Sequence, residues 1–200
     1  MDDLVFDNKK TGLTGSKIAC GNTAYKRKES DFYPTPPDVT YALIDFLRIS
    51  YRNIIWEPAC GEGHMVNQIK KMGYDVFGTD IRTGTDFLKD DAPRAFNWII
   101  TNPPFSLADQ FVIRCQQYNK PFALLLKSQY WHAKKRVEMF RKWPPAWVLP
   151  LTWRPDFCFG ERGGSPTMEV MWCVWDRSMP DGTTYIPLER PNRLMVEVGF

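Results

Sequence analysis

The chain of 200 residues has little of the two residue types from which proteins most often build metal centres. Its two histidines, His64 and His132, are too few and too far apart for a metal site or a histidine-based catalytic triad. Its five cysteines include no Cys-x-x-Cys pair, which argues against structural zinc and against a disulfide framework. Such cysteine usage suits a reducing compartment. We therefore expect no metal, and a cytoplasmic protein.

Long hydrophobic runs are also missing. No stretch approaches the roughly 20 apolar residues of a membrane-spanning helix, and the amino terminus is acidic and polar rather than signal-like. A membrane is therefore not an expected partner. The chain is 44% hydrophobic and 24% charged, which is ordinary for a soluble globular protein. Its net charge of +3 permits nucleic acid as a partner without demanding it.

The first part of the chain differs in composition from the rest. Residues 1–30 lack sustained periodicity and are rich in Gly, Thr, Lys and Asn, which predicts a flexible arm. Residues 31–200 are enough for one domain with a substantial core. Lys26-Arg-Lys28 within the arm could contact phosphate, although a solvated charge run is the better interpretation.

A rigid polar corner follows one predicted strand. Residues 95–100 are predicted to form a buried strand, and Asn102-Pro-Pro-Phe105 follows after one residue. Two consecutive prolines cannot continue a sheet ladder, so Asn102 is expected at the carboxyl end of the strand, where ligands bind in open α/β sheets. One carboxamide, rigid carbonyls and one ring suit a nucleobase or an amide. A plain strand-ending turn is the alternative.

A strand–turn–helix–strand unit precedes this corner. Residues 53–56 and 75–79 are predicted strands, and the turn between them contains Gly61 and Gly63, which let the backbone approach a ligand. Asp80 lies about 20 residues past the glycines, where an acid can accept hydrogen bonds from ribose hydroxyls. The third glycine of the dinucleotide fingerprint is absent, and a carboxylate in the turn, at Glu57, would repel a pyrophosphate. The unit therefore favours a nucleoside with a positive or neutral tail over NAD.

Strands and helices alternate along most of the chain. This predicts an α/β fold with a mostly parallel sheet and helices on both faces. A helix is expected after Thr35, which is a reasonable N-cap residue. Residues 146–151 and 169–175 are predicted to form a C-terminal antiparallel strand pair at the end of the sheet.

Basic and aromatic side chains are interleaved after residue 127. This composition suits nucleic acid, through phosphate neutralisation and base stacking. An amphipathic surface helix with solvated lysines explains it equally well. The candidate nucleic-acid-binding residues are Lys127, Tyr130, Trp131, Lys134, Lys135, Arg136 and, in a glycine-rich loop, Arg162.

Several motifs together resemble one enzyme family. Glu57-Pro-x-x-Gly-x-Gly63, Asp80, Asp86-Phe87 and Asn102-Pro-Pro-Phe105, in that order, resemble the S-adenosylmethionine-dependent amino-methyltransferases. Tyr33-Pro-Thr-Pro36 is similar to the start of the small phage-type DNA N6-adenine methyltransferases, and the likeness covers about residues 31–175. No recognition domain is inserted between these motifs, so target-recognition elements are expected to be minimal and to follow residue 127.

The resemblance implies a Rossmann-like class I methyltransferase fold with S-adenosylmethionine as cofactor. It also implies methyl transfer to the N6 amino group of an adenine flipped out of duplex DNA, in the host cytoplasm if the protein is phage-encoded. RNA adenine and a protein glutamine amide remain alternative targets, because a glutamine amide nitrogen presents the same chemical problem. A catalytically silent binding module is a further alternative. Nothing in the sequence indicates the oligomeric state.

The resemblance also assigns residue roles. It places the adenine amino group against the carbonyl oxygens of Asn102 and Pro103, in a corner stiffened by Pro104, with Phe105 stacked on the base. For the cofactor it places Asp80 at the ribose, Asp86 at the adenine amino group and Phe87 on an adenine face. A surface acid and a core ring are the alternatives for the last two. The implied cofactor set is completed by Tyr33, Thr35, Glu57, Ala59, Gly61, Gly63 and Asn102.

Overall fold

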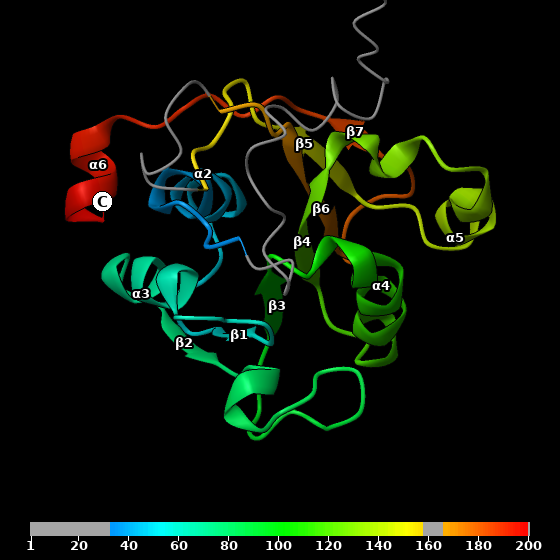
Figure 1. Ribbon diagram of the computed structural model, residues 1–200, viewed down its shortest axis with the longest axis horizontal. Coiled ribbons are helices and arrows are strands. Elements are labelled where there is room, and N and C mark those ends of the chain that lie inside the picture. Colours follow the sequence, from blue (N-terminus) through cyan, green and yellow to red (C-terminus); the bar gives the residue numbers. More distant parts are fainter. Residues whose placement is uncertain (1–32, 158–165, 200) are drawn as a thin grey trace, which may run out of the picture.

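A computed structural model describes residues 33–157 and 166–199. Both the predicted arm and Arg162 lie outside the described residues. Seven strands in the described part form one mixed sheet in the order β2-β1-β3-β4-β6-β5-β7 (Figure 1). The strands are β1 (Ile54–Glu57), β2 (Asp75–Gly78), β3 (Trp98–Thr101), β4 (Phe122–Lys127), β5 (Trp147–Pro150), β6 (Val170–Trp175) and β7 (Thr184–Tyr185).

Strand direction divides the sheet into two parts. Strands β2, β1, β3 and β4 are parallel, whereas β6 runs antiparallel between β4 and β5. The mostly parallel sheet and the C-terminal antiparallel pair are thus confirmed. The pair is not the edge of the sheet, because β7 pairs in parallel with β5. Strand β7 has only two residues, both exposed, so no periodic pattern marks it in the sequence.

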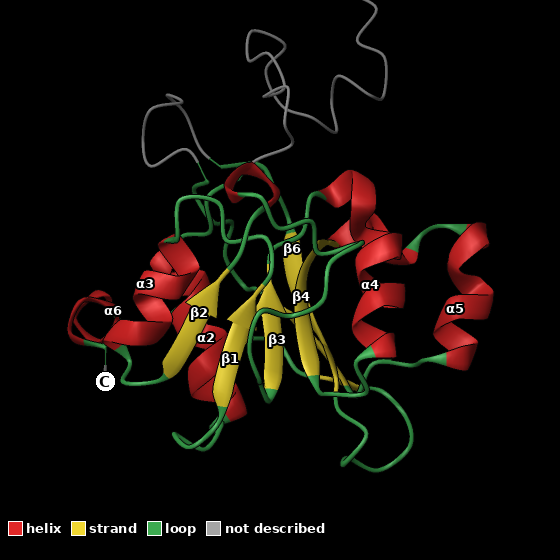
Figure 2. Ribbon diagram, turned by 90° about the horizontal axis from the view of Figure 1, so that it is seen from below, coloured by secondary structure: helices red, strands yellow, loops and turns green. Residues whose placement is uncertain are grey.

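Helices cover both faces of the sheet, as expected (Figure 2). Residues of α2 and α3 pack on one face, and residues of α4 pack on the other. The helices are α2 (Pro37–Leu47), α3 (His64–Lys71), α4 (Ala108–Gln117), α5 (Val137–Lys142) and α6 (Arg193–Val198). Short 3-10 turns connect them at η1 (Ile81–Thr83), η2 (Phe105–Leu107), η3 (Ser128–Trp131) and η4 (Lys134–Arg136).

Alternate residues of the central strands supply the two cores. Ile100 and Leu125 pack on the α2 and α3 side, whereas Ile99 and Leu124 pack on the α4 side. All four are fully buried, and burying such a side chain stabilises the fold by about 2 kcal/mol. Burial on both faces explains why these strands are continuous apolar runs in the sequence.

Two local predictions need correction. The residue at the N-cap of α2 is Pro36, with no side-chain cap, so the prediction that Thr35 caps this helix was wrong. Strand β3 begins at Trp98 rather than Ala95, because Ala95 and Asn97 are exposed. Asn97 instead uses its side-chain oxygen to accept a hydrogen bond from the Ile54 N–H at 2.8 Å.

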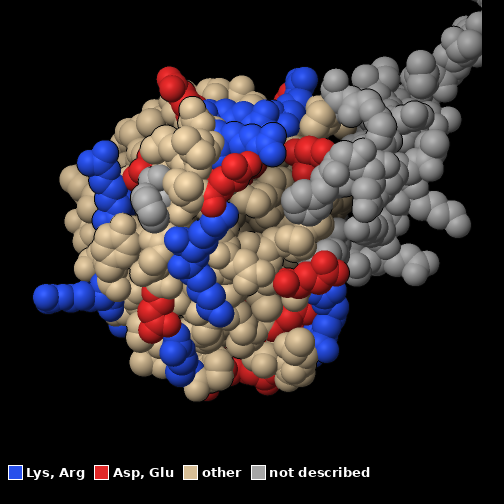
Figure 3. Space-filling model, turned by 90° about the vertical axis from the view of Figure 1, so that its left-hand side faces the viewer, with Lys and Arg blue, Asp and Glu red and all other residues tan. Residues whose placement is uncertain are grey.

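The described surface mixes charges of both signs. On the side where α3 and α6 lie, Lys and Arg side chains are interspersed with Asp and Glu side chains (Figure 3). Within the described ranges, no helix combines the length and apolar character needed to cross a membrane. The same residues contain no group of three or more His, Cys, Asp or Glu placed to hold a metal ion.

Candidate active site

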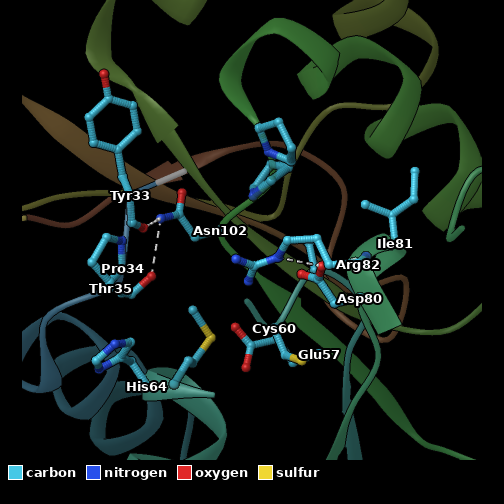
Figure 4. Close-up of a pocket in the computed structure, with 14 residues that line it drawn as sticks. Tyr33, Pro34, Thr35, Glu57, Cys60, His64, Asp80, Ile81, Arg82 and Asn102 are labelled. Atoms are coloured by element: carbon cyan, nitrogen blue, oxygen red, sulfur yellow. Dashed lines mark hydrogen bonds and ion pairs between the residues drawn. The ribbon is translucent and has the colours of Figure 1, made fainter. Parts of the chain in front are cut away.

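A pocket lies where the carboxyl ends of β1, β2 and β3 meet (Figure 4). This is the edge of a parallel sheet at which α/β proteins bind ligands. The fold brings six of the predicted cofactor residues to this one pocket, although the sequence separates the first from the last by 69 positions. The lining residues are Tyr33, Pro34, Thr35, Glu57, Ala59, Cys60, His64, Met65, Asp80, Ile81, Arg82, Asn102, Pro103 and Pro104.

The turn after β1 is fastened to the end of β2 by backbone hydrogen bonds. Thr79 N–H donates to the Glu57 carbonyl at 2.9 Å, and Cys60 N–H donates to the Thr79 carbonyl at 3.0 Å. Gly61 and Gly63 have φ angles of 56° and 81°, in the left-handed region that favours glycine. These two predicted residues therefore shape the turn that forms one wall of the pocket.

Gly78 is a supporting residue that sequence reasoning missed. A Cβ built on Gly78 would lie 2.7 Å from Cys60 Cβ and 2.9 Å from Val66 Cγ2, which is closer than real Cβ contacts allow. The missing side chain therefore lets the turn and the start of α3 rest directly on β2. Its position at the end of a predicted strand was the available signal, since glycine in a strand often marks a close backbone approach.

Glu57, the last residue of β1, is a buried acid whose side chain reaches the start of α3. Its Oε2 accepts a hydrogen bond from the Val66 N–H at 3.1 Å, and its exposed fraction is 3%. It thereby satisfies one of the unpaired N–H groups of a helix whose N-cap residue, Gly63, has no side chain. Burial raises the pKa of Glu57 well above its ordinary value, and the nearby charge of Asp80 raises it further.

Asp80 is the second buried acid of this wall, and its bonding is much richer. Its Oδ2 accepts from the Gly61 N–H at 2.8 Å, and its Oδ1 accepts from the N–H and the Nε of Arg82 at 2.9 and 3.0 Å. Burial alone would raise the pKa of Asp80, but these hydrogen bonds and the Arg82 charge together lower it. Asp80 is therefore ionised at neutral pH. Arg82 was not predicted as a pocket residue.

Asn102 projects from the end of β3 with its amide held in one orientation. Its Nδ2 donates to the Tyr33 carbonyl at 2.9 Å and to Thr35 Oγ1 at 3.1 Å (Figure 4). Because both partners are acceptors, they identify the nitrogen and fix where the oxygen lies. The side-chain oxygen of Asn102 is buried and has no hydrogen-bond partner among the described residues. Asn102 lines the pocket, so one buried, unsatisfied acceptor belongs to the pocket wall.

Phe105 lies beside this corner, in η2. Its ring centroid is 5.7 Å from that of Tyr33, and the Lys127 Nζ lies over the ring at 4.5 Å from the centroid. Phe105 is partly buried and packs against the core on the α2 side. The predicted motif Asn102-Pro-Pro-Phe105 is thus one short turn, in which two prolines separate the Asn102 amide from the Phe105 ring.

Asp86 and Phe87 do not line the described pocket. Phe87 is 3% exposed and packs against Trp56 and Phe111 at ring-centroid distances of 5.2 and 4.8 Å. Its ring therefore packs in the core, as the alternative interpretation expected, and a role on an adenine face stays a prediction. The Lys89 side chain donates a hydrogen bond to Asp86 and lowers the pKa of that carboxyl. The exposed apolar side chain at the pocket is instead Ile81, which is 67% exposed.

In the segment after residue 127, several side chains predicted to bind nucleic acid instead contact other parts of the protein. Tyr130 is buried, so its ring packs in the core of this structure, and its assignment to nucleic-acid binding stays a prediction. Both Lys135 and Arg136 donate to Asp109, at 2.7 and 2.6 Å. Trp131 stacks on Phe140, with centroids 4.2 Å apart. Of the predicted cations in this segment, Lys127 and Lys134 have no carboxylate partner among the described residues.

Comparisons with known proteins agree with this architecture. No protein-family model matches the sequence, and no curated protein matches it. A putative class I S-adenosylmethionine-dependent methyltransferase from Listeria monocytogenes is similar in structure, with a TM-score of 0.57 and 13% identity over 86% of this chain and 72% of that chain. The methyltransferase subunit of a type I restriction-modification system from Streptococcus thermophilus is similar with a TM-score of 0.56 and 13% identity, over 80% of this chain and 48% of that chain.

A dimethyladenosine transferase from Plasmodium falciparum is also similar, with a TM-score of 0.54 and 13% identity over 74% of this chain and 64% of that chain. The chain spans about half the length of the Streptococcus thermophilus subunit. At such identity the likeness establishes the fold, which is the Rossmann-like class I methyltransferase fold.

Proposed function

We propose that this chain transfers a methyl group from S-adenosylmethionine to the N6 amino group of adenine in DNA. The observation that carries the proposal is the buried, unpartnered side-chain oxygen of Asn102, whose amide nitrogen is held by Tyr33 and Thr35. An exocyclic amino group brings the N–H donors that this acceptor lacks. The acceptor lies on the wall of a pocket that also contains two buried acids.

The residues of the β1–β2 wall fit the proposed cofactor. Glu57 lines the pocket, and the hydrogen bond that its carboxyl group accepts from Val66 uses Oε2, so Oε1 would suit the positively charged part of the cofactor. Asp80 Oδ2 has accepted one hydrogen bond, from Gly61 N–H, and retains a lone pair for a ribose hydroxyl. Ile81 would cover an apolar face of the adenine. When bound, the cofactor supplies an electrophilic methyl group on a sulfonium, so no metal is required.

The residues around Asn102 would compensate for the weak nucleophilicity of the adenine amino group. The lone pair of the adenine amino group is delocalised into the ring, which makes the nitrogen unreactive. Asn102 Oδ1 and the Pro103 carbonyl would accept the two amino hydrogens and so stabilise the positive charge that develops on the nitrogen as it takes the methyl group. The carbon–sulfur bond of the sulfonium would break to leave a neutral thioether, and one amino proton would pass to solvent. Fixed acceptors of this kind accelerate reactions by about 100-fold or more. Pro103 and Pro104 keep the acceptors in place, and Phe105 stacks on a base flipped into the pocket.

DNA is the preferred target for two reasons. The segment that begins with Tyr33, which resembles the start of phage-type DNA adenine methyltransferases, directly holds the Asn102 amide. One neighbour in fold is described as the methyltransferase subunit of a restriction-modification system, whereas the dimethyladenosine transferase supports adenine as the base and not the choice of DNA over RNA. We further propose that residues 31–200 act as one cytoplasmic catalytic domain, with residues 1–30 as an arm.

A donor with a radiolabelled methyl group, offered DNA, RNA and protein in parallel, tests the proposal. We expect label in DNA, recovered as N6-methyladenine after nuclease digestion and mass spectrometry. Label confined to RNA or to a protein glutamine would overturn the DNA assignment. Donor binding in calorimetry without transfer to any substrate would instead identify a binding module. Asn102→Ala is the matched control, because it removes the proposed acceptor and leaves the β1–β2 wall intact.

A further inference from the structure

Lys127 is the last residue of β4 and lies alongside the catalytic corner. Thr101 of β3 pairs with Leu124, so β4 continues through Leu125 and Leu126 to Lys127 beside the Pro–Pro segment. The backbone of Lys127 is fixed by its pairing with Val170 of β6. A rigid strand therefore delivers this side chain to the target side of the pocket.

Among the described residues, the ammonium group of Lys127 contacts aromatic rings and no acid. Its Nζ lies over the Phe105 ring at 4.5 Å from the centroid and over the Tyr33 ring at 6.0 Å. No carboxylate of the described residues pairs with it, in contrast to Lys135 and Arg136, which both pair with Asp109. The side chain is partly buried. A partly buried cation without an acid partner is a natural counterpart for an anionic ligand.

The acids Glu57 and Asp80 line the pocket on the β1–β2 side, together with Arg82, which pairs with Asp80. Lys127 lies outside this lining, at the end of β4 and over the Phe105 ring of the acceptor corner. The ammonium also occupies space over the Phe105 ring that a stacked base would take. A base entering the pocket would displace it, and the flexible four-carbon stem lets the ammonium swing aside.

We propose that Lys127 binds the phosphodiester of the nucleotide whose base enters the pocket, and that it leaves the Phe105 ring to do so. The inference rests on the proposed function and deepens it, because it makes Lys127 a residue that selects a nucleic acid over a neutral glutamine amide. A lysine acts on phosphate as a mobile point charge, which suits a group that first covers the ring and then moves to the substrate.

The test compares Lys127→Met with Lys120→Met in the full chain. Lys120 is exposed just before β4, at the opposite end of the same strand, and is the matched control. Anisotropy with a fluorescein-labelled DNA duplex over a range of salt should show about a tenfold loss of affinity for Lys127→Met. The dependence of log affinity on log salt should become shallower by about one unit. KM for genomic DNA should rise by a similar factor, while the donor Kd stays unchanged.

Lys127→Arg should recover most of the affinity, because the charge is kept. If Lys127→Met does not fold, Lys127→Gln carries the same expectation. Two outcomes would overturn the proposal: the uncharged Lys127 variant binds DNA with wild-type affinity and salt dependence, or Lys120→Met loses as much affinity. In either case the wild-type protein would still methylate DNA, so the proposed function would stand. If wild-type protein labels only RNA or protein, the proposed function fails first, and the assignment of Lys127 to a DNA phosphate fails with it.

Discussion

The pocket wall built from β1 and β2 differs from the wall built from β3 and β4 in how its polar atoms are bonded. On the first wall, Asp80 accepts three hydrogen bonds, and Glu57 accepts one from the start of α3. On the second, Asn102 Oδ1 and the Lys127 ammonium have no hydrogen-bond or ion-pair partner among the described residues. The two walls lie on adjacent strands of one sheet.

This difference in hydrogen bonding suggests different roles for the two walls: one would hold a ligand, and the other would act on one. Asp80 is held rigidly by three hydrogen bonds, and its Oδ2, which accepts only one of them, keeps a lone pair that could bind one group of a cofactor without rearrangement. A buried acceptor without a partner costs about 1–3 kcal/mol of stability. Such a cost at Asn102 is understandable if a substrate supplies the missing donor. On this comparison we propose that the β1–β2 wall binds the cofactor and that the β3–β4 wall serves the chemistry.

The largest expected effect follows from removing the unsatisfied acceptor. Asn102→Ala should lower the rate of methyl transfer by about 100-fold or more, because an acceptor used in the transition state is lost. The donor Kd should change by less than about twofold, since the β1–β2 wall is untouched. Single-turnover transfer and calorimetric donor titration measure the two quantities. Unchanged turnover would remove Asn102 from the mechanism.

Thr35→Val is the graded control for this prediction. It removes one of the two acceptors that hold the Asn102 nitrogen and keeps the side-chain volume. We expect a loss of transfer of about fivefold, in keeping with one hydrogen bond of about 1 kcal/mol. If the donor Kd rises and transfer from bound donor is unchanged, Thr35 acts on the cofactor carboxylate, as the family resemblance implies, rather than on Asn102.

A smaller effect, on binding, is expected on the other wall. Asp80→Asn should raise the donor Kd by about tenfold, because a charged acceptor bonds a hydroxyl more strongly than a neutral one. Calorimetry checks this, with Asp86→Asn as the comparison. The sequence resemblance gives both acids a cofactor role, but the structure places only Asp80 at the pocket. Equal losses in the two variants would restore the cofactor role of Asp86.

Sequence reasoning worked best where a short motif fixes the backbone. The Pro–Pro segment after β3 and the glycines after β1 determine where strands end, and the parallel topology then brings those ends together. Asn102 and Asp80 could therefore be placed at one pocket from their motifs alone. The alternation of apolar runs with amphipathic helices was likewise enough to predict the sheet and its covering layers.

Local sequence was not enough where a tertiary partner decides what a side chain contacts. Phe87 and Tyr130 are aromatic residues in the expected regions, but neighbouring rings and strands bury them. Local sequence cannot distinguish a ring that faces a ligand from one that faces the core. Similarly, nothing near Arg136 in the sequence indicates its pairing with Asp109, which lies 27 positions away.

The smallest expected effect contrasts the two acids of the β1–β2 wall through pH. Burial raises the pKa of Glu57 above its ordinary value, so the folded protein holds this proton more tightly than the unfolded chain does. Its contribution to stability is complete below the ordinary pKa and declines as pH rises through the raised value. Asp80, whose pKa is lowered, contributes oppositely: its stabilisation is present above its ordinary pKa and is lost as pH falls through the lowered value.

Glu57→Gln should therefore remove part of the decline in stability as pH rises above the ordinary range of a glutamate. Urea unfolding of the wild type and the variant, from about pH 5 to about pH 8, measures the difference in slope. The bound donor, being cationic, should favour ionised Glu57 and make its own affinity increase with pH in the wild type alone. Identical slopes in both proteins would show that Glu57 keeps an ordinary pKa and that the two acids do not differ.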